Sequence, residues 1–200
     1  DLDAEYALSL LDVPHKLVLS PVVELPFGEG KRWATSGIGN VLLGKWTLSS
    51  IIAFESGFPI SVSNNSNNLS SAFFRVQRPN LTGDPATSGS RDDRFYFNGN
   101  PGVWLDNAAF SNPGAFVLGS APRTLDNART PHRNNWDFVA AKEVKLVGKA
   151  RGQLRIEVLN VTNTVKTRGP NSVFGSSAFG RVTSQRGFMR LTQLMFRMSF

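Results

Sequence analysis

Apolar and polar residues alternate along five segments of the chain, at residues 16–25, 45–63, 135–146, 151–158 and 193–200. In the fourth segment, every second residue is polar and charged residues predominate among these, namely Arg151, Gln153, Arg155 and Glu157. A period of two places neighbouring side chains on opposite faces of a β-strand, whereas a helix would spread these charges around its circumference. The pattern therefore predicts an all-β fold, an antiparallel meander of about five strands.

The connections between these segments fall into two length classes. Residues 27–44 and 147–150 form the shorter links, and residues 64–134 and 161–187 form the longer ones. In an antiparallel sheet, both long links would lie at one end and both shorter links at the other. Compact domains seldom contain an irregular loop as long as 64–134 unless the loop has a function of its own. We therefore expect functional loops at one end of the sheet.

The length and the charges of the strands fit a membrane barrel. A strand of about 10 residues tilted by about 40° covers roughly 25 Å, which is the height of the apolar band of an outer-membrane barrel. Because an arginine that faces lipid near the midplane costs about 2–4 kcal/mol, the charged face should line a water-filled lumen. The residues predicted to face this lumen, with ion pairs between adjacent strands, are Arg151, Arg155, Glu157, Gln193 and Arg197.

Aromatic residues cluster near both predicted ends of the strands. Phe27, Trp33 and Trp46 lie beside the shorter links, and Phe58 and Trp136 lie beside the long ones. Aromatic rings are enriched at the two membrane interfaces, where one part of the ring is apolar and another wet. Ordinary packing in a protein core is an equally good explanation of this feature taken alone.

Composition excludes several other classes of protein. The chain has 200 residues, no cysteine and two histidines, so it has no disulfide, thiolate zinc site or cysteine nucleophile. The longest apolar runs contain four residues, whereas a membrane-spanning helix needs about 20. The net charge of +7 is dispersed along the chain without a basic helix or an RNA-binding signature, so we expect no nucleic-acid partner.

The sequence offers no set of residues for catalysis. No nucleophile stands at a motif spacing from His15 or His132, and no phosphate-binding or dinucleotide-binding loop occurs. Asp92 and Asp93, with nearby asparagines, could supply oxygen ligands to calcium, but they lack the order of a known calcium loop. We therefore expect no enzyme activity and no cofactor.

Several blocks of sequence resemble the C-terminal part of TonB-dependent outer-membrane receptors, in particular the Oar-like group with a carboxypeptidase-regulatory-like domain. Their order and spacing carry the resemblance over nearly the whole chain. The blocks are Val13-Pro14-His15-Lys16-Leu17, residues 24–31, Gly44-Lys45-Trp46, Ser56-Gly57-Phe58-Pro59, Asn135-Trp136-Asp137, Arg155-Ile156-Glu157 with Asn160 and Asn163, Phe179-Gly180-Arg181, and the ending Arg190, Gln193, Arg197 and Phe200. Residues 164–167 depart from the family, which usually has a His-Pro-containing stretch there.

The resemblance implies a transport function in the cell outer membrane of a Gram-negative bacterium. The complete barrel of such receptors has about 22 strands and encloses a plug. Residues 1–200 would be the C-terminal part of that barrel, with the plug, the N-terminal strands and the segment that contacts TonB upstream. The partners implied are outer-membrane lipid, the TonB complex, an unidentified transported substrate and the barrel-assembly machinery. The assembly signal would be the C-terminal pattern Leu194, Phe196, Met198 and Phe200.

The long link 64–134 contains aromatic residues that could close over a substrate. These are Phe73, Phe74, Phe95, Tyr96, Phe97, Trp104 and Phe110. Aromatic residues in such loops also commonly pack the loop itself. Two other interpretations of the whole chain stay open: a soluble all-β carbohydrate-binding module, and a small complete or oligomeric outer-membrane barrel.

Overall fold

The computed structural model describes residues 5–69, 77–87, 102–148 and 150–200. The chain divides into two compact units, each built from three separate stretches of sequence. Unit 1 contains Asp1–Pro14, Ser56–His132 and Thr167–Arg186, and unit 2 contains His15–Glu55, Arg133–Lys166 and Gly187–Phe200. The strands predicted from alternation lie mainly in unit 2, and the predicted long links lie mainly in unit 1.

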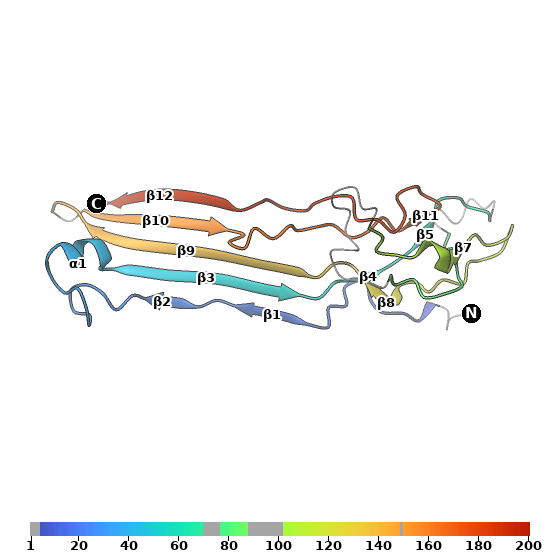
Figure 1. Ribbon diagram of the computed structural model, residues 1–200, viewed down its shortest axis with the longest axis horizontal. Coiled ribbons are helices and arrows are strands. Elements are labelled where there is room, and N and C mark those ends of the chain that lie inside the picture. Colours follow the sequence, from blue (N-terminus) through green and yellow to red (C-terminus); the bar gives the residue numbers. More distant parts are fainter. Residues whose placement is uncertain (1–4, 70–76, 88–101, 149) are drawn as a thin grey trace. The chain divides into compact units, whose positions relative to one another are not determined.

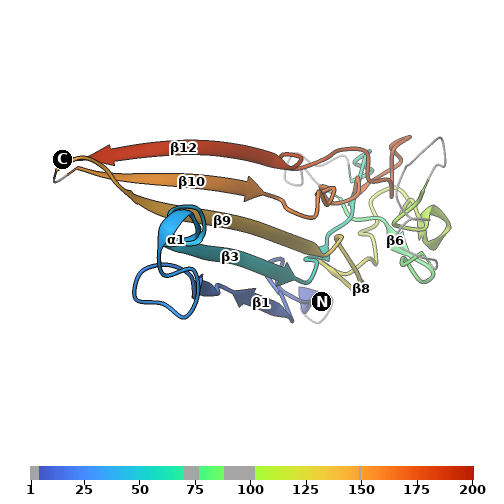
Figure 2. The ribbon, with the colours of Figure 1, turned by 60° about the vertical axis from the view of Figure 1, so that its left-hand side comes forward.

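Unit 2 is built on one antiparallel sheet in the order β1-β3-β9-β10-β12, with β2 also paired to β3. Figures 1 and 2 show the long strands β3, β9, β10 and β12 side by side. This arrangement confirms the predicted antiparallel meander. The strands are β1 (Lys16–Leu19), β2 (Val22–Glu24), β3 (Trp46–Glu55), β9 (Arg133–Lys145), β10 (Arg151–Leu159) and β12 (Leu191–Ser199).

The first two predicted strands differ from the structure. Residues 16–25 form β1 and β2 with a break at Ser20 and Pro21, because proline has no N–H to donate to the ladder. The second strand was predicted to reach residue 63, but β3 ends at Glu55. Directly after it, Gly57 lies so close to the backbone of Thr130 that a Cβ atom would stand 1.7 Å from the Thr130 carbonyl oxygen. This close approach belongs to unit 1.

A short helix was not predicted in the link at residues 27–44. The structure places α1 at Gly37–Leu43, and none of its residues is buried. This helix has seven residues, or about two turns, and is therefore shorter than the window of about 11–18 residues in which helical periodicity can be recognised.

The described residues of unit 1 include paired strands, although this sequence was expected to form irregular loops. Among the described residues, β5 and β11 pair in parallel, whereas β4 pairs with β8 and β6 with β7 in antiparallel fashion. The elements are β4 (Pro59–Ile60), β5 (Ser63–Asn64), β6 (Asn80–Leu81), the 3-10 turn η2 (Asn107–Ala109), β7 (Phe110–Ser111), β8 (Leu125–Arg129) and β11 (Val173–Phe174). The strands other than β8 have two residues each, and strands of this length show no period that the sequence pattern could indicate.

The hydrophobic core of unit 1 joins residues that lie far apart in the sequence. Leu105 and Leu125 are fully buried at its centre. The rings of Phe110, Phe174 and Phe179 contact one another with centroids 5.4–5.9 Å apart. Each buried large side chain contributes about 1.5–3 kcal/mol to the free energy of folding, so this core can hold the described segments of the long links together.

Substituting Gly180 by alanine is expected to destabilise unit 1. Gly180 has a φ of +72°, and a Cβ atom would lie 2.3 Å from the carbonyl oxygen of Leu105. The left-handed conformation alone costs a residue with a Cβ about 1–2 kcal/mol, and displacement of the backbone adds to this. The control is Gly114→Ala, whose added Cβ would make only an ordinary contact of 3.7 Å with Val117.

The two variants are to be compared by hydrogen exchange of unit 1 peptides in the full-length protein. Faster exchange is expected in the Gly180→Ala variant only. Equal protection in both variants would contradict the described packing of Gly180 against Leu105.

Candidate functional site

The strand register places the alternating polar and apolar side chains of β10 and β12 on opposite faces of the unit 2 sheet. On β10, Arg155 stands opposite Ala141 of β9 and Met195 of β12, and Glu157 stands opposite Val139 and Gln193. Directly opposed residues in an antiparallel sheet share a face. The residues predicted to face a lumen, Arg151, Arg155, Glu157, Gln193 and Arg197, therefore all lie on one face, which we call the polar face.

A cluster of ion pairs lies at one end of the polar face, where β3 ends and β9 begins. The Glu55 carboxylate pairs with Arg133 of β9 and, at 3.6 Å, with Lys16 of β1. Both pairs join adjacent strands, as the sequence predicted for this face. Further along β10, Arg155 pairs with Glu157 on the same strand.

Next to this cluster, an amide and a carboxylate form a second polar network. Asn135 donates from Nδ2 to Asp137 Oδ2 at 2.7 Å and accepts a hydrogen bond from Lys166. Asp137 Oδ1 accepts from the backbone N–H of Asn160 at 2.9 Å, and Asn160 is buried. Alternation along residues 135–146 places Asn135 and Asp137 on the same face of their strand, but it does not show that Lys166 and Asn160 contact them.

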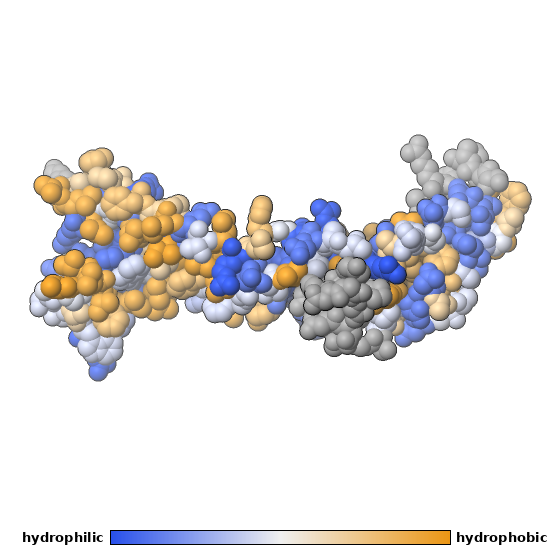
Figure 3. Space-filling model, turned by 45° about the horizontal axis from the view of Figure 1, so that its top comes forward, coloured by the Kyte–Doolittle hydropathy of each residue, from blue (hydrophilic) through white to orange (hydrophobic). Residues whose placement is uncertain are grey.

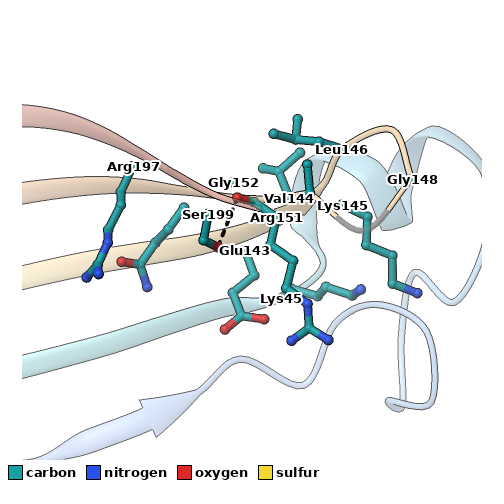
Figure 4. Close-up of a pocket in the computed structure, with 12 residues that line it drawn as sticks. Lys45, Glu143, Val144, Lys145, Leu146, Gly148, Arg151, Gly152, Arg197 and Ser199 are labelled. Carbon is teal, nitrogen blue, oxygen red and sulfur yellow. Dashed lines mark hydrogen bonds between the residues drawn. The ribbon is translucent and has the colours of Figure 1, made fainter.

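A hollow lies at the other end of the polar face, beside the turn between β9 and β10. Its charged lining comes from Lys45, Glu143, Lys145, Arg151 and Arg197, and its volume is about 790 Å³. Figure 4 shows Lys45, Glu143 and Arg151 on one side of the strands, with Val144 and Leu146 directed to the other. Four cations and one carboxylate give this hollow a positive charge, which favours anions at this place.

The opposite face of the sheet is apolar, and most of its side chains are partly or largely exposed. It carries Leu154, Ile156 and Val158 on β10, with Leu194 and Phe196 directly opposite on β12. Leu194 and Phe196 are 71% and 56% exposed. Figure 3 shows hydrophobic residues gathered over the part of the molecule that carries the sheet. Water-soluble monomers rarely expose so large an apolar surface, so this face requires an apolar environment.

The residues predicted as an assembly signal lie at the end of the last strand. Leu194, Phe196 and Met198 share the apolar face of β12, and all three are exposed. Phe200 follows the strand and is 95% exposed. The structure thus leaves this pattern accessible, and its recognition by the assembly machinery stays a prediction.

The predicted ligand-contacting aromatic residues fall into two groups. Trp104 and Phe110 are buried in the core of unit 1, and Trp104 Nε1 donates a hydrogen bond of 2.6 Å to the Arg129 carbonyl. Burial leaves no ring face on these two residues for a ligand, so for them packing of the loop replaces the expected contact. The other five, Phe73, Phe74, Phe95, Tyr96 and Phe97, lie outside the described residues.

No metal centre is found in the part of the chain that the structure describes. Within it, no group of three or more histidine or acidic side chains is arranged to hold a metal ion. Asp92 and Asp93, considered above for calcium, lie outside this part. None of the described helices has the length and the hydrophobicity needed to cross a membrane.

Substituting Glu55 by glutamine is expected to destabilise the sheet of unit 2. The side chain of Glu55 is 19% exposed, and its neutralisation leaves Arg133 and Lys16 without their common carboxylate. Loss of charged partners at such a half-buried site costs about 1–3 kcal/mol. Glu24→Gln serves as the control, because the Glu24–Lys31 pair is solvent-exposed and should contribute little. Urea unfolding of both full-length variants in detergent micelles is the measurement, and equal midpoints would contradict this role for Glu55.

Comparison with protein families gives one match. Residues 1–193 match a family model described as an outer membrane beta barrel domain. Comparison with curated proteins and comparison with solved structures both give no match.

Proposed function

Because the chain belongs to the outer membrane beta barrel domain family and resides in the outer membrane, we propose that it forms part of the wall and lumen of an energy-coupled receptor of the TonB-dependent kind. The single-layer sheet with one charged and one exposed apolar face is the observation that carries this proposal. In a barrel, the apolar face meets lipid and the polar face meets the water of the lumen. The same family membership and the exposed apolar face argue against the soluble carbohydrate-binding module.

The sheet needs further strands to form a closed barrel. Its outer strands β1 and β12 each pair on one side only within the described residues. Single-chain outer-membrane barrels have about eight strands or more, and an open edge is not tolerated in lipid. A receptor barrel supplies the missing strands from the same polypeptide, whereas an oligomeric barrel supplies them from further copies of the chain.

The lengths of the strand connections support a receptor with large extracellular parts. Leu146 and Ala150 lie on the two sides of the turn between β9 and β10, and the Leu146 N–H donates a hydrogen bond of 3.1 Å to the Ala150 carbonyl. At their other ends, β3, β9 and β10 continue into the stretches of unit 1. Outer-membrane barrels have short periplasmic turns and longer extracellular loops. These long connections would therefore be the extracellular ones and would carry the substrate-binding surface.

The positive charge of the hollow on the polar face indicates a broad class of substrate. Its cations would lie in the lumen near the periplasmic end of the barrel. They favour an anionic passenger. Two of them, Arg151 and Arg197, are also among the residues predicted to face the lumen.

Contact with TonB in living cells tests the receptor function. The full-length protein is to be expressed with a photo-crosslinking residue in its most N-terminal segment, in cells with and without TonB. A crosslinked product that contains TonB is expected only in the cells that produce it. If the protein is present in the outer membrane and no such product forms, the proposed receptor function is contradicted. The proposal that the chain forms part of a barrel would still stand.

Native mass spectrometry distinguishes the receptor from the oligomeric barrel. In detergent, the full-length protein is expected to keep one copy per barrel. A mass corresponding to several copies would favour the oligomeric barrel instead.

A further inference from the structure

The helix α1 exposes an apolar surface at the short-turn end of the sheet. Ile38, Val41 and Leu42 are 78%, 69% and 63% exposed. Positions 38, 41 and 42 have the i, i+3 and i+4 spacing that places side chains on one face of a helix. The helix contains no charged residue. An exposed surface of this kind is unfavourable in water and indicates a partner of apolar character.

Hydrogen bonds fix the C-terminal end of α1 on the apolar side of the sheet. Trp46 of β3 and Lys142 of β9 stand directly opposite each other in the register, on the face that carries Leu48 and Ala140. The Leu42 carbonyl accepts from Trp46 Nε1 at 2.9 Å and from Lys142 Nζ at 3.3 Å, and the Gly44 carbonyl also accepts from Lys142. The C-terminal end of α1 therefore lies on the side of the sheet that carries the apolar face.

The charged side chains around α1 have the arrangement found at a membrane interface. The Lys142 ammonium lies 5.4 Å from the centre of the Trp46 ring, and the Arg32 guanidinium lies 5.0 Å from that of Trp33. A lysine near the bilayer midplane would cost about 2–4 kcal/mol, whereas at the interface its ammonium reaches polar groups and phosphates. Tryptophan rings are enriched at the same depth. Lys142 and the two tryptophans therefore mark the headgroup level.

We propose that α1 is an interfacial anchor that lies in the periplasmic leaflet of the outer membrane. Ile38, Val41 and Leu42 insert among the acyl chains of glycerophospholipids, and Arg32 and Lys142 face their phosphates. A helix that lies in the interface buries its apolar side chains about 5–10 Å into the boundary between headgroups and acyl chains. The anchor rests on the barrel orientation given under Proposed function, and it would hold the link between β2 and β3 at the membrane surface.

Fluorescence quenching in lipid vesicles tests this anchor on the full-length protein. Residues 1–200 contain no cysteine, so single cysteines can be introduced among them and labelled with an environment-sensitive fluorophore, with any cysteine elsewhere in the full-length protein replaced by serine. The variants are Val41→Cys on α1, Leu154→Cys on the apolar face as the reference for the barrel wall, and Glu143→Cys on the polar face as the control. The vesicles contain phospholipid with a spin-label quencher attached near the headgroup or near the end of the acyl chain.

The anchor predicts a large loss of emission at Val41→Cys with the quencher near the headgroup and a smaller loss with the deep quencher. The label at Leu154→Cys should be quenched by the spin-labelled phospholipid, whereas the label at Glu143→Cys should be quenched by neither of the two quenchers. Emission at Val41→Cys that resists both quenchers would overturn the anchor, whether water or protein surrounds the label. If Leu154→Cys also resists quenching, the barrel orientation itself has failed, so the two failures are distinguishable.

Discussion

Substituting Ile156 by arginine is expected to destabilise the folded barrel by about 2–4 kcal/mol, a change of roughly 30- to 700-fold in the folding equilibrium. Ile156 lies near the middle of β10, and its direct neighbours on the apolar face are Ala140 and Leu194. An arginine there must hold its charge among acyl chains or deform the bilayer around it. The free energy of unfolding of the full-length protein in lipid vesicles, from a urea titration, is the measurement.

The matched control for this variant is Val139→Arg. Val139 also lies at the middle of its strand, but the register places it on the polar face between Ser49 and Glu157. A guanidinium there meets water and a carboxylate, so we expect little change in stability. If both arginines destabilise the protein equally, the assignment of the two faces is wrong.

Substituting Phe179 by alanine is expected to unfold unit 1 locally while the strands of unit 2 stay protected. Its ring is 6% exposed and makes edge contacts with Phe110 and Phe174, both at a centroid distance of 5.4 Å. Removing a buried phenylalanine side chain costs about 3–5 kcal/mol, because the cavity left behind is only partly filled. Hydrogen exchange of peptides from the two units reports the effect separately for each.

The control for Phe179→Ala is Phe116→Ala, at a position in unit 1 that is 74% exposed. Loss of an exposed ring should leave the exchange of unit 1 unchanged. Equal effects of the two variants would show that the aromatic cluster does not stabilise the unit. Collapse of the protection in unit 2 would show instead that the two units unfold as one.

The strands of the sheet could be predicted from the sequence because one physical pattern determines them. Each long strand has polar side chains mainly on one face of the sheet and apolar side chains mainly on the other. This arrangement gives the sequence a period of two. The prediction for residues 135–146 and 193–200 differs from β9 and β12 by two residues or fewer at each end. The same pattern placed the lumenal candidates of β10 and β12 on one face.

The architecture of unit 1 could not be predicted in this way. Its core brings together Val62, Leu105 and Leu125, and its strands β4, β5, β6, β7 and β11 have two residues each. Burial in this unit follows from contacts between distant segments, and such contacts leave no period in the sequence. For this reason Trp104 and Phe110 resembled ligand-contacting residues of a loop, although both are core residues.

For the cluster of ion pairs at the end of β3, the type of interaction could be predicted from the sequence, but the residues that pair could not. Alternation along residues 45–55 places Glu55 on the same face as Thr47 and Ser49, and ion pairs between adjacent strands were expected on the charged face. Its partners Arg133 and Lys16 depend on the register of β9 and β1 against β3, which periodicity within one strand does not give.

Site-directed spin labelling along β10 tests most directly whether the apolar face of this sheet meets lipid. Labels at residues 152–158 of the full-length protein in vesicles report accessibility to oxygen, which concentrates in the bilayer, and to a water-soluble nickel complex. High oxygen accessibility is expected at Leu154, Ile156 and Val158, with higher nickel accessibility at the residues between them. Low oxygen accessibility at Leu154, Ile156 and Val158 would mean that protein covers this face, and it would contradict the barrel wall.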